Sequence, residues 1–213
     1  MRKFVFGFAF GMAMSGFAAL VDGTAYTLGV GETDAFTGTA AIPQFTVDGA
    51  FTIGADSTLT ISPATDKTSL LATGAGISAT LNLEAGATLD IQAYNKSNSN
   101  QALALGNLGG TGTVNVANGA LLKSVQRIRV GCNGSSAEQR VLPSLGVINL
   151  GGTLECVYLE LAAYFPNDAT TMANTNLYLR PAVINLLPGG ILKPTSISVN
   201  DAAVGTLNLQ GGT

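Results

Sequence analysis

The chain has 213 residues, enough for one domain with its own core. It is 46% hydrophobic and only 11% charged, with 27 glycines and neither histidine nor tryptophan. The formal charge is −3 without a basic stripe, which argues against a nucleic-acid partner because phosphate contacts need clustered Lys and Arg. This composition disfavours a helical protein and favours many short strands joined by tight turns.

The N-terminus is typical of a secretory signal peptide. Arg2 and Lys3 precede an apolar run from Phe4 to Leu20, and small residues follow where a peptidase would cut, at several equivalent positions. The competing interpretation is a retained anchor, since this run lies at the lower length limit of a membrane span. We expect no transmembrane segment after cleavage, and a secreted or bacterial cell-surface location.

A repeated unit is the strongest signal in the chain. It places an Asn between two apolar residues and follows them with a glycine turn and another apolar pair. The copies span 80–89, 113–121, 147–154, 183–192 and 206–213. Their asparagines, Asn82, Asn115, Asn149, Asn185 and Asn208, are 33, 34, 36 and 23 residues apart. A degenerate copy begins at Phe51, with Thr52 in the place of Asn. A constant motif at variable spacing indicates one structural unit with variable loops.

Each unit contains a further alternating segment between its glycine turn and the next Asn motif. These segments are 102–105, 127–130, 158–161 and 196–199. One unit therefore corresponds to about three short strands. We divide the chain into a signal peptide (1–22), an N-terminal cap with the first strands (23–48) and the repeats (49–213).

The period of the motif predicts how the units pack. In apolar-Asn-apolar, the two aliphatic side chains point one way and Asn points the other. Coiling such strands around an axis and stacking the coils makes a continuous aliphatic core and a ladder of outward Asn side chains. We therefore predict an all-β fold, a right-handed parallel β-helix. An antiparallel sandwich is the alternative, but it does not require Asn at the same place in every unit.

The two cysteines, Cys132 and Cys156, lie 24 residues apart, about one coil of such a solenoid. An exported protein can form a disulfide, so stacking could bring them together as a bridge. The alternative is a pair of free, buried thiols. A basic cluster of Lys123, Arg127, Arg129 and Arg140 is interpreted as an exposed strand face.

Two long insertions, 131–146 and 162–182, occupy equivalent places in successive units. Repeated insertions at one position emerge from one edge of a solenoid, often a binding side. The candidate ligand-binding residues there are Tyr164, Asp168, Tyr178 and Arg180. The alternative is surface variation without a function, and an insertion at 92–100 falls elsewhere in its unit.

No catalytic, metal-binding or cofactor-binding motif stands out, and we expect a protein that is not an enzyme. Glycoside cleavage needs two carboxylates around one sugar, but Glu155 and Glu160 would lie on opposite faces of a regular strand. Histidine, the commonest general base, is missing. The glycines of 74–79 have a dinucleotide-type spacing, but they lead into a strand and indicate a turn.

The segment Gly-Thr-Leu-Asn-Leu-Gln-Gly-Gly-Thr at 205–213, with its relatives at 112–120 and 146–154, resembles the autotransporter-associated β-strand repeats of bacterial secreted proteins. The start of the mature chain, 25–32, is also similar to that family. The resemblance implies a β-helix passenger, structural or adhesive, displayed at or released from the bacterial surface.

The partners that this resemblance implies are surface glycans or the surface of a host or neighbouring cell. The family's C-terminal translocator barrel does not occur in these 213 residues, so we expect a truncated chain whose anchor lies beyond Thr213. Self-association through the open coil end is a further possibility. The alternative function is a carbohydrate-binding or carbohydrate-cleaving β-helix of the pectate-lyase kind.

Overall fold

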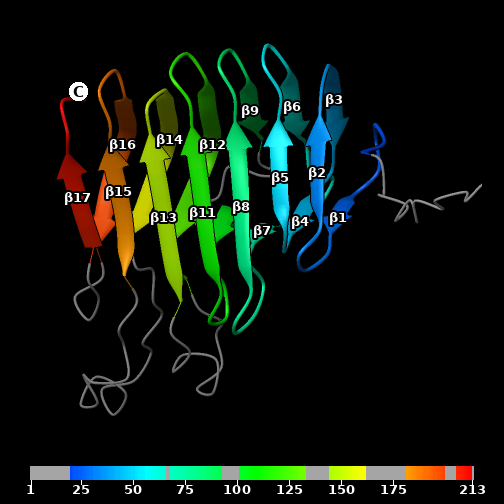
Figure 1. Ribbon diagram of the computed structural model, residues 1–213, viewed down its shortest axis with the longest axis horizontal. Coiled ribbons are helices and arrows are strands. Elements are labelled where there is room, and N and C mark those ends of the chain that lie inside the picture. The colour runs from blue at the N-terminus through cyan, green and yellow to red at the C-terminus, as the bar shows by residue number, and fades with distance from the viewer. Residues whose placement is uncertain are drawn as a thin grey trace, which may run out of the picture.

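The computed structural model describes residues 20–65, 68–92, 101–132, 144–161, 181–199 and 205–212. Over these residues the protein is all-β, and every strand pairing is parallel. The strands stack side by side along the long axis of the molecule (Figure 1). Most of the predicted signal peptide, residues 1–19, lies outside the described residues.

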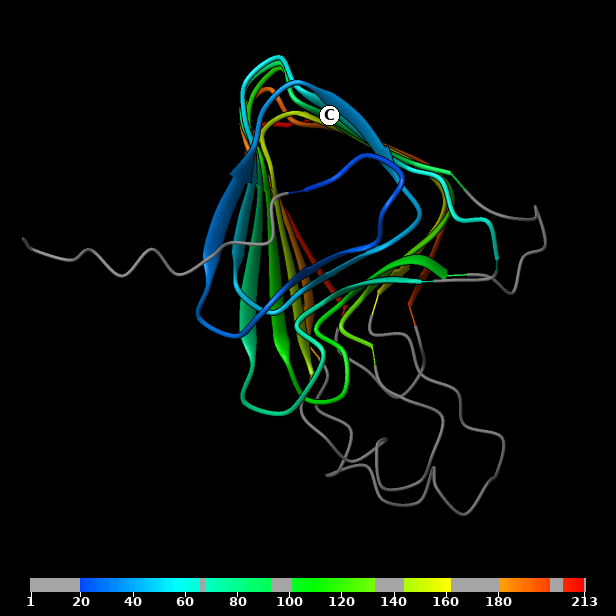
Figure 2. The same ribbon diagram turned by 90° about the vertical axis from the view of Figure 1, so that its right-hand side faces the viewer.

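One sheet forms a flat side of the stack, left in Figure 2. Seven strands of the described part of the chain belong to it, in the spatial order β17-β15-β13-β11-β8-β5-β2. They are β2 (Thr33–Phe36), β5 (Ala50–Ile53), β8 (Ser78–Leu83), β11 (Thr111–Val116), β13 (Leu145–Leu150), β15 (Ala182–Leu186) and β17 (Gly205–Leu209).

The second sheet wraps around the other two sides. Its ten described strands are β1 (Tyr26–Leu28), β3 (Thr39–Ile42), β4 (Phe45–Val47), β6 (Thr58–Ile61), β7 (Ser69–Leu71), β9 (Thr88–Ile91), β10 (Gln101–Leu105), β12 (Leu121–Val130), β14 (Thr153–Leu161) and β16 (Ile191–Val199). The first half of β12 pairs with β9 and its second half pairs with β10, so β12 bends around a corner.

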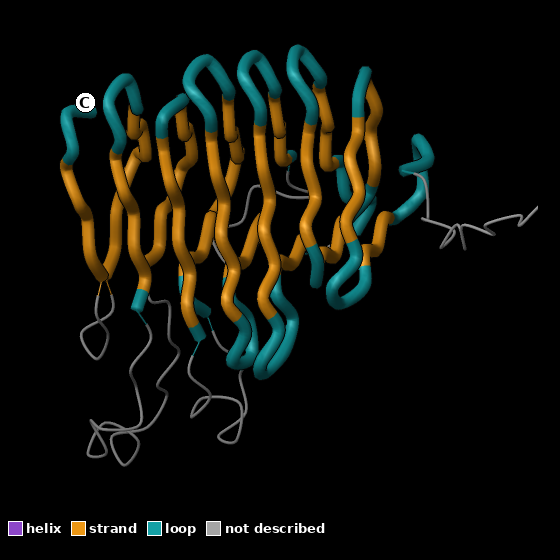
Figure 3. The backbone as a smooth tube through the Cα atoms, in the orientation of Figure 1, coloured by secondary structure: helices purple, strands orange, loops and turns teal. Residues whose placement is uncertain are grey.

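The predicted three strands per unit are found in the early coils, as in β8-β9-β10. In later coils the second and third strands merge into one long, bent strand, first in β12. The register between β12 and β14 shifts between Ser124 and Arg127, which places an irregularity at the bend. The described chain thus winds as successive coils joined by short turns, an arrangement that fits a β-solenoid (Figure 3).

Alternation along each strand creates the core. In β8, Leu81 and Leu83 are buried while Thr80 and Asn82 face outward. The inward positions are in register from coil to coil, so Leu81 pairs with Val114, which pairs with Ile148. Because each aliphatic side chain meets its equivalent above and below, a three-residue amphipathic strand buries a face that it could not bury alone.

Glycine closes the turn that follows each Asn motif. Gly86, Gly119 and Gly189 have φ angles of 77°, 83° and 83°, in the left-handed region that side chains with a Cβ resist. The glycines of 74–79 form a turn that enters β8, with the Ile77 N–H donating to the Gly74 carbonyl at 3.1 Å. Because these turns recur, the chain changes direction at the same place in each coil.

The two ends of the described stack differ. At the N-terminal end, Leu20 packs against the core and the Gly23 N–H donates to the Ala41 carbonyl, so this segment crosses the first coil (Figure 2). In the last described coil, the core positions reach the surface, and Leu209 is 69% exposed. In the part of the chain that the structure describes, no helix has the length and apolar character needed to cross a membrane.

Candidate functional site

The ligand-binding residues predicted from the long insertions cannot be placed. Tyr164, Asp168, Tyr178 and Arg180 lie outside the described residues, as does Arg140. The surface chemistry that the structure does describe lies on the two sheets themselves. Two regions concentrate it: a row of asparagines on the flat sheet and a group of charges at the bend of the other sheet.

The asparagines of the repeat form a continuous hydrogen-bonded ladder. The Asn115 amide donates to the Asn82 Oδ1 at 2.8 Å, Asn149 donates to Asn115 at 2.8 Å, and Asn185 donates to Asn149 at 2.8 Å. Asn208 adds a rung at 2.7 Å, and Asn82 donates to the Thr52 hydroxyl at 3.3 Å. We call these six residues the Asn row. They stack because their positions pair directly in the sheet.

A second outward row runs beside the Asn row, two residues earlier in each strand. Its members are small or β-branched and uncharged: Ala50, Thr80, Thr113, Val147, Val183 and Thr206. We call it the Thr/Val row, and the two rows together are the Asn face. β-branched side chains pack well on a pleated surface, which suits this row to a regular sheet. Neither row of the Asn face contains a charged residue.

A shallow groove of about 320 Å³ follows the Asn row across the strands. Asn82, Asn115 and Asn149 line it together with the apolar side chains of Ala117 and Leu187. The lining also includes the carboxylate of Glu84, whose Oε2 accepts a hydrogen bond from the Ala55 N–H at 3.0 Å. The groove therefore combines amide groups with apolar surface.

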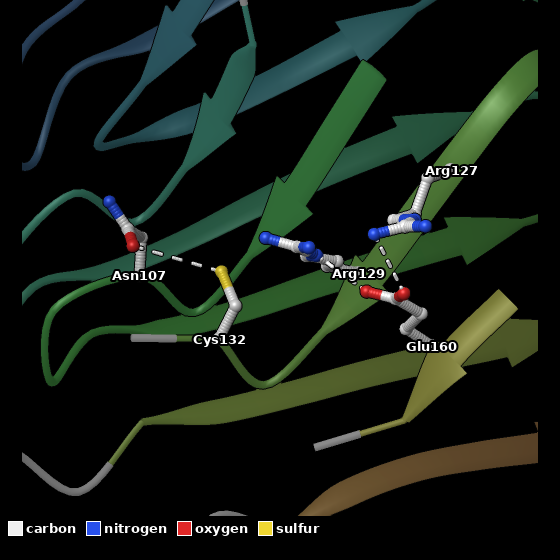
Figure 4. Close-up of polar contacts among 5 residues, drawn as sticks. All are labelled: Asn107, Arg127, Arg129, Cys132 and Glu160. Carbon is white, nitrogen blue, oxygen red and sulfur yellow. Dashed lines mark hydrogen bonds and ion pairs between the residues drawn. The ribbon is translucent and has the colours of Figure 1, made fainter. Parts of the chain in front are cut away.

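The other region is the charged corner, which consists of Arg127, Arg129 and Glu160 (Figure 4) together with Tyr158. The Arg129 Nε donates to the Glu160 Oε2 at 2.6 Å, and the Arg127 Nη1 lies 3.0 Å from the Glu160 Oε1. The Arg127 guanidinium also lies over the Tyr158 ring, 5.5 Å from its centroid. One carboxylate thus binds two guanidinium groups.

The prediction of an exposed basic strand face is wrong for these arginines. Arg127 and Arg129 do lie on one side, but their side chains are only 15% and 2% exposed. Burial lowers the pKa of Arg129, and the neighbouring Glu160 opposes that shift. Among the described residues the Arg127 Nε has no hydrogen-bond partner. The alternation of the strand predicted correctly that both arginines lie on one side. It did not predict that this side is buried, because burial depends on the neighbouring coils.

Of the two alternatives for the cysteines, a bridge or a pair of free, buried thiols, the structure has the second. Both cysteines are free and buried. Cys156 pairs in register with Ser124, 32 residues earlier, and not with Cys132, because one coil here is longer than the 24 residues between the cysteines. The Cys132 Sγ donates to the Asn107 Oδ1 at 3.7 Å instead (Figure 4). Burial raises the pKa of the Cys156 thiol to about 12.

The carboxylates of β14 are arranged differently from the regular strand that the sequence suggested. Glu155 and Glu160 both face outward, since the bend adds an extra outward position at Val157 and Tyr158. They lie on different sides of the corner and bind different cations, because the Glu155 Oε1 lies 3.3 Å from the Lys193 Nζ. Nothing in this arrangement directs both carboxylates at one sugar.

Metal binding finds no support in the described residues, where no group of three or more Cys, Asp or Glu side chains could hold an ion. No protein-family model, curated protein or solved structure matches the chain. The surface features with a definable chemistry are therefore the uncharged Asn face and the ionic charged corner.

Sequence analysis identified the Asn row from its period. It missed the charged corner, although Arg127 and Arg129 stand at the places that Tyr158 and Glu160 occupy in the next unit.

Proposed function

We propose that the chain is a non-catalytic passenger segment of an exported, autotransporter-like protein, with a structural or adhesive role at the bacterial surface. We further propose that its coils form a right-handed parallel β-helix. Parallel strands joined within one sheet by a crossover are right-handed in about 98% of cases, which supports this hand. The apolar run after Arg2 and Lys3 supports export.

The observation that carries the proposal is the Asn row. Its ladder joins the described coils from Thr52 to Asn208 without a break in register. A stack of coils tied in this way on its outside and by aliphatic rows on its inside is a stiff rod. A stiff rod with a long, regular side suits presentation of a surface away from a cell.

Export and adhesion are tested separately on the full chain. Expressed in a Gram-negative host, the chain should reach the periplasm or the cell surface. A variant with Arg2→Glu and Lys3→Glu should remain inside, because the leader needs its positive start. Beads that carry the purified chain should bind bacterial or host cells more strongly than beads with a globular protein of similar charge. Retention of the native chain in the cytoplasm would overturn the exported-passenger proposal.

The second candidate is a carbohydrate-binding β-helix, and the groove beside the Asn row favours it. Amide groups next to apolar surface can hydrogen-bond sugar hydroxyls and contact the faces of sugar rings. A carbohydrate-cleaving version is less well supported, because Glu155 and Glu160 are separated by the corner and engaged with cations. Release of reducing ends from a panel of polysaccharides would favour the cleaving version.

A further inference from the structure

Charge is distributed unevenly between the two outer surfaces of the coil. The Asn row and the Thr/Val row contain no charged residue over six successive strands. The second sheet carries an outward row in register in which four successive residues are charged, namely Asp90, Lys123, Glu155 and Lys193, after the uncharged Ala41 and Thr60. Only 11% of the chain is charged, so two rows without charge are not unusual by themselves. What distinguishes this surface is the groove, which lies beside the amides of the Asn row.

The Asn ladder leaves hydrogen-bonding capacity unused. A carboxamide has two N–H donors and an oxygen with two lone pairs. Each interior rung, such as Asn115, uses one N–H toward the preceding coil and one lone pair for the following coil. The described side chains accept nothing further from these amides, and the amide atoms are not among the buried unpaired atoms. Each rung therefore offers one donor and one acceptor to the solvent at the groove.

These free groups repeat at the spacing of the coils. Neighbouring parallel strands lie about 4.8 Å apart, so an unused N–H and an unused lone pair recur at that interval along the solenoid axis. The strands that carry them, β8, β11 and β13, lie side by side (Figure 1). A partner that matches this array is itself a repeating chain, whose hydroxyl-bearing units recur at about the spacing between neighbouring coils.

From this array we infer that the groove beside the Asn row binds a neutral polysaccharide that runs along the solenoid axis. Sugar hydroxyls both donate and accept hydrogen bonds, so they match the two free groups of each rung. The apolar side chains of Ala117 and Leu187 provide surface for the sugar rings. The absence of cations from the two rows disfavours nucleic acids and acidic polysaccharides, whose binding relies on clustered Lys and Arg. The inference rests on the proposed adhesive function and names its partner.

Such a site binds through many weak contacts. Each rung contributes a solvent-exposed hydrogen bond whose net value is small, about 0.5–1.5 kcal/mol. Affinity then grows with the number of rungs that one chain spans, because later contacts form intramolecularly. We therefore expect binding to insoluble or long polysaccharides and little binding to monosaccharides.

The test is sedimentation of the purified chain with insoluble neutral polysaccharides, namely cellulose, chitin and a β-1,3-glucan, and with an acidic polygalacturonate gel as a contrast. Ala117→Lys with Leu187→Lys adds bulk and charge to the lining of the groove, at two positions that lie two coils apart, without replacing a core residue or a rung of the ladder. This variant should lower the bound fraction by about tenfold or more. The matched control, Lys123→Ala with Lys193→Ala on the second sheet, should bind as the native chain does.

The outcomes separate this inference from the proposed function. Binding to a neutral polysaccharide that the Ala117→Lys, Leu187→Lys variant loses and the control keeps supports the inference. Failure to bind any neutral polysaccharide overturns it, and if beads with the chain still bind cells, the adhesive proposal stands without it. Equal binding by the variant also overturns it. So does concentration-dependent dimerisation of the native chain that the variant abolishes, because the Asn face is then an interface between two copies.

Discussion

The Asn face and the charged corner solve the same stacking problem with different side chains. In a stack of parallel coils, each outward residue meets its equivalent above and below. A carboxamide can repeat in every coil, because it donates to one neighbour and accepts from the other. A charged group cannot, since identical charges directly opposite repel each other.

The charged residues therefore alternate. Asp90, Lys123, Glu155 and Lys193 change sign at each step along their row. At the corner, Glu160 of one coil binds both arginines of the preceding coil. The Asn row can thus extend with the number of repeats, whereas an ionic row requires a different residue in each coil. Four predictions sharpen this comparison.

Removing Glu160 should have the largest effect. Its carboxylate pairs with Arg129, whose side chain is 2% exposed, so Glu160→Ala takes a charged partner at 2.6 Å away from a buried guanidinium. Breaking such a pair costs about 3–5 kcal/mol. Urea unfolding should show this loss, whereas Arg129→Met, which removes the charge and keeps similar bulk, should cost much less. Equal costs for the two variants would contradict the argument.

Removing one interior rung of the Asn row should have a smaller effect. Asn149 takes part in two ladder bonds, to Asn115 and to Asn185. Its neighbours are only half-buried and can turn to water, so we expect Asn149→Ala to lower the free energy of unfolding by about 1–2 kcal/mol. Asn208, which is exposed and has one ladder bond, is the matched control. Its replacement by Ala should cost about half as much.

Alkaline pH should lower the stability of the fold through the buried thiol of Cys156 in the bent sheet. The pKa of Cys156 is about 12 in the folded chain and 9.0 without burial, so between these values the unfolded chain has released a proton that the folded chain retains. Unfolding is then favoured as pH rises, and stability falls by up to about 1.4 kcal/mol per pH unit from pH 9 to 12. Cys156→Ala should remove this part of the slope. Identical pH profiles of unfolding for both proteins would contradict it.

The smallest effect is expected at the exposed ion pair. The Lys193 and Glu155 side chains are 57% and 39% exposed, and their charged atoms lie 3.3 Å apart. Replacing Glu155 by Ala should change stability by less than about 0.5 kcal/mol, because solvent already screens the pair. Salt titration of the unfolding midpoint provides the measurement. A cost close to that of Glu160→Ala would mean that burial does not separate the two pairs.

Much of this architecture followed from local patterns. The alternation around Asn82 and its equivalents located the strands of the flat sheet, because a strand turns successive side chains to opposite faces wherever it lies. The glycine after each motif located the turn. The sequence did not reveal the merging of two strands into β12, since the bend and its register shift depend on pairing with β9 and β10.

The sequence by itself determined which residues face inward, that the Asn positions are equivalent, and that the units stack. Those properties depend on the two-residue period of a strand and on the repeat, both of which are local. Only the tertiary structure decided that Cys156 meets Ser124 and not Cys132, that Arg129 is buried, and that Glu160 binds two arginines. These contacts join residues more than 30 positions apart, and the length of the intervening coil sets which residues meet.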